Sequence, residues 1–506
     1  MNHSTFLRTK HFCFALALTF LWGCANDRAN SGALNQQIRS FLEDDQGITA
    51  SECGELRNLI ANDPALQRTL GTPEQLTAHI DAMAEKMSKG RRAKISYPIE
   101  IACDEGQTSQ KAAAYNFYIE NSGSMYGYMG DNTAFDDVVL GLMTKINRYD
   151  EEINMFFVND KIHPVQEKFQ DFMDYLDPNS LRKLGNTRSS NIADVLKLVV
   201  EQQAEDEKAA IILSDFIFSI SDHNNVRSEL TDQKYGITNI IHNNRLKEKG
   251  LGFLIMKFNS DFEGNYFRFD NTTVKLNNDR PYYVWVIDQQ DRIQNFVQKY
   301  EVNRLKEFEE DLIIYSSADK PSPYYSILKS TDGQGRFNLI DRGGNQPIKA
   351  IKDIQYSTRG EKVFQFSLAF DASSLPVSED YLSNPANYQL SSDMEDVFEI
   401  VEVKKVNNRN VSTNDRGYQG SATHYLVLSS TEISAGKQQL DITLLKNLPA
   451  WIAESSTIDD RNIGDSNEDL SKTFGFQDLM EGVAEDFKPR GGKIDKYFSL
   501  SLELER

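Results

Sequence analysis

One carboxylate and two hydroxyls alternate along a short polar segment. Glu120, Ser122 and Ser124 directly follow the apolar run 115–119, and Gly123 lies between the two serines. Hard cations such as Mg²⁺ bind carboxylate, hydroxyl and water oxygens, and a turn that contains glycine can direct several short side chains at one point. The segment therefore predicts an oxygen-lined cation site at the end of a buried strand.

Strand and helix patterns alternate over residues 112–302. Five apolar runs predict strands, and the amphipathic segments between them predict helices: strands at 115–119, 153–158, 209–213, 252–258 and 282–287, helices at 134–148, 191–204, 238–249 and 289–302. This alternation is typical of a doubly wound, mostly parallel sheet covered by helices. Ligands of such sheets bind beyond the carboxyl ends of the strands.

Three loop tips at that edge carry oxygen ligands. The first strand delivers Glu120, Ser122 and Ser124, the third ends in Ser214-Asp215, and the loop 185–191 reads Gly-Asn-Thr-Arg-Ser-Ser-Asn. A first strand ending in D-x-S-x-S, a hydroxyl residue before Asn-Ile and a later strand ending in Asp resemble the von Willebrand factor A domain.

That resemblance implies a site for one divalent cation. Ser122 and Ser124 match the two serines of the family pattern, and Asp215 matches its distal aspartate. The third hydroxyl belongs to Ser190, which precedes Asn191-Ile192, or to Thr187 if the loop is longer. The implied ion is Mg²⁺, with Mn²⁺ or Ca²⁺ as alternatives, and its open position accepts a carboxylate from a partner protein.

Glu120 departs from the family pattern, which has aspartate at this position. The extra methylene moves the carboxylate, whereas Mg²⁺ requires near-ideal octahedral distances. Weaker binding, a larger ion and a retained fold without metal are therefore the alternatives. Tyr126 and Tyr128 follow the serines and are interpreted as an exposed pair at the rim of the site, where they would contact the partner.

The N-terminus predicts a lipid anchor. Arg8 and Lys10 precede the apolar segment 12–22, which is too short to span a bilayer and is followed by Gly23-Cys24. This resembles a bacterial lipoprotein signal: residues 1–23 are removed, Cys24 is acylated, and 24–35 form a tether. Ala25 resembles signals for outer-membrane sorting. Location in the cell envelope, attached through lipid to the outer membrane, is expected.

The two cysteines that remain after Cys13 is removed and Cys24 is acylated, Cys53 and Cys103, predict a disulfide, because the compartment is oxidising. Two free buried thiols are the alternative.

Two further regions flank the predicted sheet. Helical spacing over 36–95 predicts a helical segment. Short strands with turn signals over 305–506 predict a β-sandwich of immunoglobulin-like type with a C-terminal helix and strand.

The net charge of the chain argues against binding to nucleic acid. The net charge is −20, and loss of Arg8 and Lys10 makes it −22 (53 − 75), so the surface repels nucleic acid. Envelope adhesion or assembly by a cation-dependent protein-binding module is the favoured hypothesis, without enzymatic activity. A metal-dependent hydrolase and a structural scaffold with a degenerate site are the alternatives; no histidine stands at a motif spacing from the site.

Overall fold

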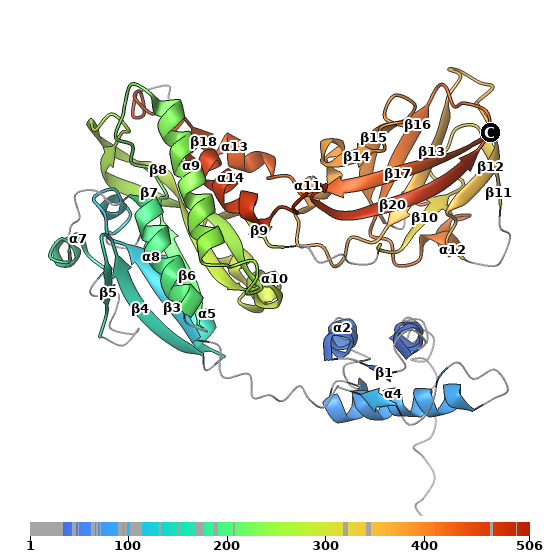
Figure 1. Cartoon of the computed structure of the whole chain (residues 1–506), viewed down its shortest axis with the longest axis horizontal. Coiled ribbons are helices and arrows are strands. Elements are labelled where there is room, and N and C mark those ends of the chain that lie inside the picture. The colour runs from blue at the N-terminus through green and yellow to red at the C-terminus, as the bar shows by residue number, and fades with distance from the viewer. Residues whose placement is uncertain are drawn as a thin grey trace, which may run out of the picture. The chain divides into compact units, whose positions relative to one another are not determined.

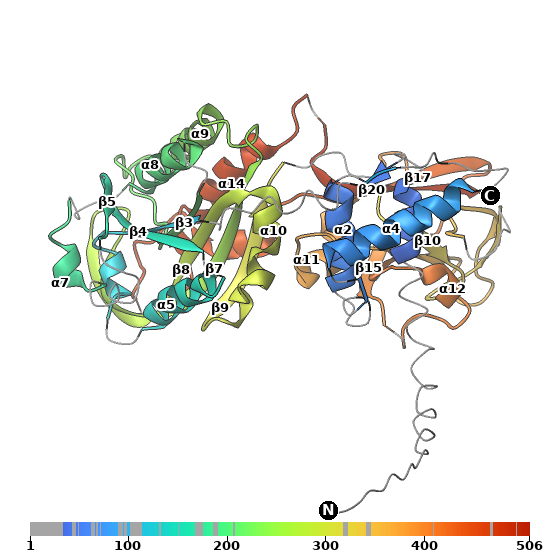
Figure 2. The ribbon, with the colours of Figure 1, turned by 90° about the horizontal axis from the view of Figure 1, so that it is seen from below.

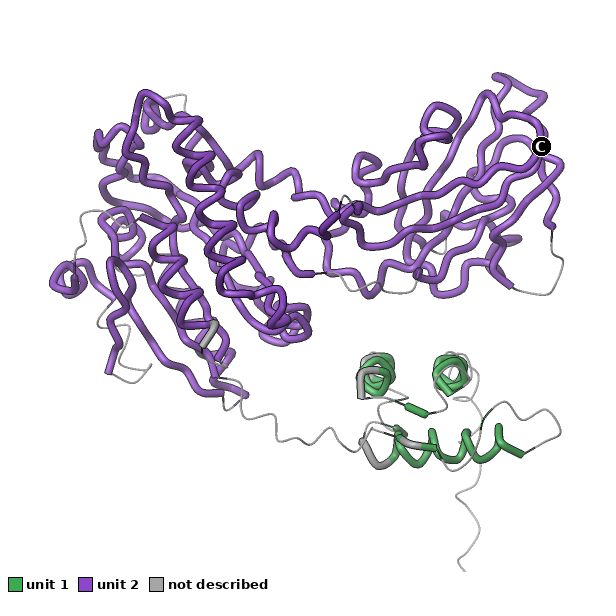
Figure 3. Tube along the Cα trace, viewed as in Figure 1, with its two compact units in different colours: residues 1–112 green, residues 113–506 purple. Residues whose placement is uncertain are grey.

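The structure is a computed structural model in which the chain forms two compact units, residues 1–112 and 113–506 (Figures 1 and 3). It describes residues 34–42, 47–48, 50–61, 66, 69–70, 72–89, 95, 99–101, 114–130, 133–149, 151–166, 176–185, 191–205, 208–316, 322–340, 346–407, 409–465, 469–491 and 493–506. None of the described helices is both long and apolar enough to cross a membrane.

The first unit is mainly helical, as predicted. Residues 34–42 are helical, α2 spans Ala50–Ala61 and α4 spans Pro73–Ser88, while β1 (Gly47–Ile48) pairs in parallel with β2 (Glu100–Ile101). Thr72 and Gln75 form a capping box at the start of α4, which satisfies two otherwise unpaired amides. One apolar face of each helix enters a common core, so this unit has a hydrophobic centre of its own.

The second unit contains a seven-stranded sheet. Its strands in spatial order are β5 (Ile162–Pro164), β4 (Glu152–Val158), β3 (Ala114–Glu120), β6 (Ala209–Ser214), β8 (Thr273–Gln289), β7 (Leu251–Phe267) and β9 (Phe308–Ile314). β3 pairs in parallel with β4 and β6, and the other four pairings are antiparallel. The α/β class is confirmed, but the prediction of a mostly parallel sheet is corrected to a mixed one.

The difference arises at β7 and β8. The sequence predicts two short strands, 252–258 and 282–287, in a mostly parallel sheet, whereas the structure joins two long strands as one hairpin, with Leu251 opposite Gln289 and Phe267 opposite Thr273. β8 therefore lies between β6 and β7 and runs antiparallel to both. The outer half of the hairpin, residues 260–280, extends past the carboxyl end of β6; we call it the hairpin arm.

Helices cover both faces of this sheet because its central strands are apolar on both sides. In β3, Phe117 and Ile119 enter one core, whereas Tyr118 enters the other. The first core also contains α5 (Ala134–Asn147) and α10 (Gln290–Lys299), and the second contains α8 (Ile192–Glu205), α9 (Val226–Asn243) and α14 (Phe476–Phe487). Figure 2 shows α8 and α9 on one side of the sheet and α5 on the other. We call this part the α/β lobe.

Two further sheets form a β lobe around one shared core. One has the order β10 (Tyr325–Leu328), β13 (Phe364–Phe370), β16 (His424–Ser430) and β15 (Glu399–Lys405); the other has the order β11 (Arg336–Leu339), β12 (Ala350–Gln355), β20 (Lys496–Glu505), β17 (Lys437–Leu445) and β14 (Tyr388–Leu390). Apolar residues from both sheets, such as Phe366 and Leu500, belong to the same cluster, so the sheets pack face to face.

The chain passes between the two lobes more than once. β9 belongs to the α/β lobe, although it lies beyond the predicted boundary at residue 305. After β17 the chain returns through α13 (Ala450–Glu454), β18 (Ser456–Thr457), β19 (Thr473–Phe474) and α14, and then re-enters the β lobe as β20. The predicted C-terminal helix and strand thus exist, and the structure places them in different lobes.

Candidate functional site

The segment Glu120–Ser124 begins at the carboxyl end of β3, as predicted. Glu120 is the last residue of the strand, and the Asn121 amide continues the ladder by donating to the Val158 carbonyl (2.8 Å). The chain then turns through Ser122 and Gly123 into the short helix η1 (Met125–Gly127). The hydroxyls of Ser122 and Ser124 lie 3.0 Å apart, so the two serines point at one place.

The end of β6 completes this edge. Because β3 and β6 are parallel neighbours, with Ile119 opposite Leu213, Ser214 and Asp215 reach the same level as Glu120. Phe216, the next residue, has a φ of 51°, a left-handed conformation that is rare for a residue with a large side chain. This conformation costs free energy, which the packing of the buried Phe216 ring against Trp285 helps to offset.

Glu120 is held by Ser214, which the sequence placed at this edge without a role. The Ser214 hydroxyl donates to Oε2 of Glu120, and it also accepts a hydrogen bond from the Phe216 amide (2.8 Å). Glu120 is buried, with 3% of its surface exposed. Oε2 of Glu120 therefore accepts a hydrogen bond inside the fold. The feature of the sequence that could have predicted this contact is Ser214, the serine that ends β6.

Asp215 is buried and only partly satisfied. Its exposed fraction is 2%, and Oδ1 accepts a hydrogen bond from the Ile217 amide (3.3 Å), whereas Oδ2 has no hydrogen-bond partner in the described part of the chain. An unsatisfied buried carboxylate oxygen costs free energy unless something compensates it. Burial raises the pKa of the Asp215 carboxyl, while the Ser124 hydroxyl, the Ile217 amide and the charge of Arg280 act in the opposite direction.

Arg280 is a residue of this edge that the sequence did not reveal. It lies in the hairpin arm with 1% of its surface exposed; Nη1 donates to the Leu470 carbonyl (2.6 Å), and its guanidinium carbon lies 4.7 Å from the centroid of the Tyr266 ring. Nε and Nη2 have no hydrogen-bond partner among the described residues. The positive charge of Arg280 lowers the pKa of the buried Asp215 carboxyl, although the two side chains form no direct ion pair in the described structure.

The hairpin arm and the described residues of two segments, 455–465 and 469–475, together cover this edge of the sheet. The Tyr266 hydroxyl donates to Oδ2 of Asp460 (2.7 Å), and the Phe269 amide donates to Oδ1 of the same residue (3.1 Å). The Arg268 guanidinium donates to the Ile463 carbonyl (2.6 Å). Asp460, with 2% exposure, therefore links its own segment to the hairpin arm by hydrogen bonds.

Gly127 allows the hairpin arm to approach the serine-bearing turn. A Cβ at Gly127 would lie 2.3 Å from Cε2 of Phe262, whose ring packs edge-on against Tyr128 (4.9 Å between centroids). Gly127→Ala is therefore expected to destabilise the protein by about 1–3 kcal/mol, because the ring must shift within a packed core. Thermal unfolding measures this effect.

Gly236 supplies the matched control. It lies inside α9, and a Cβ there meets no atom within 4 Å. Gly236→Ala is expected to be neutral or to stabilise by up to about 1 kcal/mol, since alanine favours the helix. Equal effects of the two substitutions would show that the arm does not press on the turn.

Several predicted residues lie outside the described part of the chain: Thr187, Ser190, Cys24 and Cys103. Cys53 is buried and disulfide-bonded, while its pairing with Cys103 stays a prediction.

The interpretation of Tyr126 and Tyr128 as an exposed pair needs correction. Tyr128 is 1% exposed and donates to the Pro281 carbonyl (2.6 Å), and Tyr126 is partly buried and donates to Oδ1 of Asn121 (3.0 Å).

The donor set fits a hard cation only if hydroxyls take part. Nowhere in the described ranges do three or more histidine, cysteine, aspartate or glutamate side chains gather as a metal-binding group. Two serine hydroxyls and the unpartnered Oδ2 of Asp215 are oxygen donors of the kind that Mg²⁺ and Mn²⁺ bind. Chemically, the arrangement can hold a small cation or a water network beneath the hairpin arm.

Comparison with known proteins does not assign the chain to a family. No protein-family model, no curated protein and no solved structure matches it.

Proposed function

We propose that the protein is a lipid-anchored binding protein of the cell envelope that grips an acidic group of another protein through a divalent cation. The observation that carries the proposal is Oδ2 of Asp215, a buried carboxylate oxygen without a partner in the described structure, next to the hydroxyls of Ser122 and Ser124. A bound cation would satisfy this oxygen and would remove the cost of burying it.

The proposal gives the site residues different roles. Ser122, Ser124 and Asp215 would hold the cation directly, together with a hydroxyl from Ser190 or Thr187. Glu120 is oriented by Ser214 and would act through water on the same ion. Mg²⁺ is the expected ion, with Mn²⁺ or Ca²⁺ as alternatives, and it would supply an open coordination position for a carboxylate. No proton transfer is needed for this role, so the activity is binding and not catalysis.

The proposed roles of the two lobes and of the N-terminus rest on the sequence patterns described above. The α/β lobe would be a von Willebrand factor A domain with an added hairpin arm, and the β lobe a module of immunoglobulin-like type. Acylation of Cys24 would attach the protein to the outer membrane, because the acidic surface gives no electrostatic attraction to anionic headgroups.

Capture of partners with and without a chelator tests the proposed function. The full chain is crosslinked in its native envelope in Mg²⁺ and, separately, in EDTA. We expect proteins that are captured only in Mg²⁺ and that are lost in the Asp215→Ala variant. Asp222→Ala is the matched control, because this partly exposed aspartate lies in the loop after β6 and, among the described residues, its side chain accepts hydrogen bonds from Asn224 and Asn225. Partners that survive both EDTA and Asp215→Ala would contradict the proposal.

A further inference from the structure

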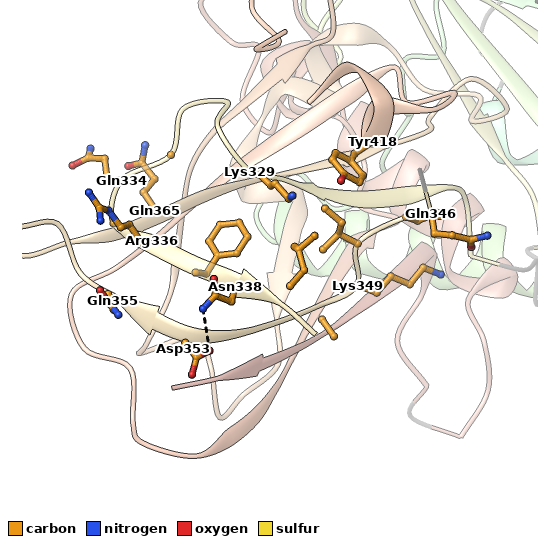
Figure 4. Close-up of a pocket in the computed structure, with 17 residues that line it drawn as sticks. Lys329, Gln334, Arg336, Asn338, Gln346, Lys349, Asp353, Gln355, Gln365 and Tyr418 are labelled. Carbon is orange, nitrogen blue, oxygen red and sulfur yellow. Dashed lines mark hydrogen bonds between the residues drawn. The ribbon is translucent and has the colours of Figure 1, made fainter. Parts of the chain in front are cut away.

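A large open cavity lies in the β lobe, far along the chain from the site at Asp215. Its volume is about 1100 Å³, and β11, β12 and the turn before β11 supply most of its wall (Figure 4). The volume slightly exceeds the range typical of ligand sites, which is roughly 300–1,000 Å³. No residue of the candidate cation site lines it, so any role of this cavity is independent of the proposed function.

The charge of the cavity wall opposes that of the whole protein. Lys329, Arg336 and Lys349 line it, against a single acidic residue, Asp353, which gives +2 (3 − 1) in a chain of net charge −20. None of the three cations forms an ion pair with any residue that the structure describes. Unpaired cations around one hollow of an acidic protein attract a negatively charged ligand.

Aromatic rings hold two of these cations in place. The Lys349 ammonium lies 4.2 Å from the centroid of the Tyr325 ring, and the Lys329 ammonium lies 5.1 Å from that of Tyr418. In Figure 4, Arg336 lies toward one end of the cavity and Lys349 toward the other, with Lys329 near the side opposite β12. Charges spread along the hollow in this way suit an elongated ligand with several anionic groups better than a single phosphate ion.

Amide side chains make up the rest of the polar wall. Gln334, Gln346 and Gln355 are exposed and make no side-chain hydrogen bond to a described residue. Asn338 donates to Asp353 (3.1 Å), and Gln365 donates to the Asp332 carbonyl (2.6 Å). A carboxamide carries both a donor and an acceptor, and a hydroxyl does too, so a row of amides is complementary to a ligand rich in hydroxyls.

The edge strand argues against an extended peptide as the occupant. β11 is the outermost strand of its sheet, so it could in principle add a further strand. However, it has only four residues, and its pairing with β12 shifts register between Arg336 and Asn338. Short and irregular edges are poor templates for strand addition.

We propose that this cavity binds an acidic saccharide chain, with its carboxylate, sulfate or phosphate groups at Lys329, Arg336 and Lys349 and its hydroxyls at the amides. Such a ligand meets both the positive charge and the amide-rich wall, whereas a neutral saccharide uses only the amides. An acidic peptide would have to pair with the short and irregular edge strand to place its backbone in the cavity. The affinity falls as salt rises, because the charged contacts are exposed to solvent.

Titration calorimetry of the full chain tests this assignment. The probes are tetrasaccharides that carry carboxylate, sulfate or phosphate groups, the matching neutral tetrasaccharide, and a tetra-aspartate peptide. At least one acidic saccharide is expected to bind with one-to-one stoichiometry, at least tenfold more tightly than the neutral saccharide and the peptide. Binding should weaken at least tenfold in Lys349→Gln and in Arg336→Gln.

Lys352→Gln is the matched control, because Lys352 lies on the same strand as the cavity wall but does not line the cavity. It should leave the affinity unchanged. Absence of binding by all three acidic saccharides would overturn the proposal. So would tighter binding of the peptide, or equal losses in Lys349→Gln and Lys352→Gln.

Discussion

Asp415→Ala is expected to destabilise the protein by about 3–5 kcal/mol, because several buried donors would lose their acceptor together. The Asp415 side chain is fully buried and accepts four hydrogen bonds from the segment after β10: from the amides of Lys329 (2.8 Å), Ser330 (2.8 Å) and Thr331 (2.7 Å) and from the Thr331 hydroxyl (2.8 Å). Hydrogen bonds to a carboxylate are stronger than those between neutral groups. Urea unfolding monitored by circular dichroism measures the loss.

Two controls distinguish this role from a general effect of removing charge. Asp393→Ala removes an exposed carboxylate of the same lobe and should change the free energy of unfolding by less than about 0.5 kcal/mol. Asp415→Asn keeps the shape and part of the accepting capacity, so its effect should be intermediate. If Asp415→Ala and Asp393→Ala had equal effects, the hydrogen-bonded turn would contribute little to stability.

The Arg280→Met substitution is expected to act on stability and on cation binding in opposite directions. Removing this buried guanidinium leaves the Leu470 carbonyl without its donor, which should cost about 1–3 kcal/mol, and it also removes the positive charge that lowers the pKa of the Asp215 carboxyl. The same positive charge repels a cation at the proposed site. Variants that remain folded should therefore bind Mn²⁺ several-fold more tightly than the wild type.

Arg461→Met is the matched control for this variant. Arg461 is exposed and pairs with Asp459 in the segment that covers the same edge. Exposed ion pairs contribute about 0–1 kcal/mol, so little change in stability or in Mn²⁺ affinity is expected. An Arg280→Met protein with wild-type stability and wild-type affinity would show that Arg280 and Asp215 do not interact.

The central strands and their end residues could be predicted from the sequence, because local patterns determine them. The runs at 115–119, 153–158 and 209–213 are apolar on both faces, and each appears as a strand, β3, β4 and β6. Parallel pairing then brings Glu120 and Asp215 to one edge without further information. The juxtaposition of Ser122 with Ser124 follows from their spacing on one turn.

The hairpin arm could not be predicted in the same way. Beyond Phe258 the sequence Asn-Ser-Asp-Phe-Glu-Gly-Asn-Tyr-Phe mixes polar and aromatic residues, and its strand character depends on pairing with β8 and on packing against η1. The polar sequence around Arg280 is typical of a solvent-exposed segment, yet tertiary packing buries the Arg280 side chain. Its role depends on contacts with Leu470, which lies 190 residues away in the chain.

The passage of the chain between lobes was missed for a related reason. α14 and β20 were predicted as the C-terminal helix and strand of the β-rich domain, and both exist. α14 is amphipathic, but its pattern does not say which apolar surface covers it; in the structure it packs with α9 in the second core of the sheet. Contacts over such separations leave no local periodicity in the sequence.

Titration of the full chain with Mn²⁺ in a calorimeter measures the proposed cation site without requiring a known partner. We expect one ion per chain, with the heat abolished in Asp215→Ala and retained in Asp222→Ala. A wild-type protein that shows no heat with Mn²⁺, Mg²⁺ or Ca²⁺, or an Asp215→Ala variant that binds as the wild type does, would show that Asp215 is not part of a cation site.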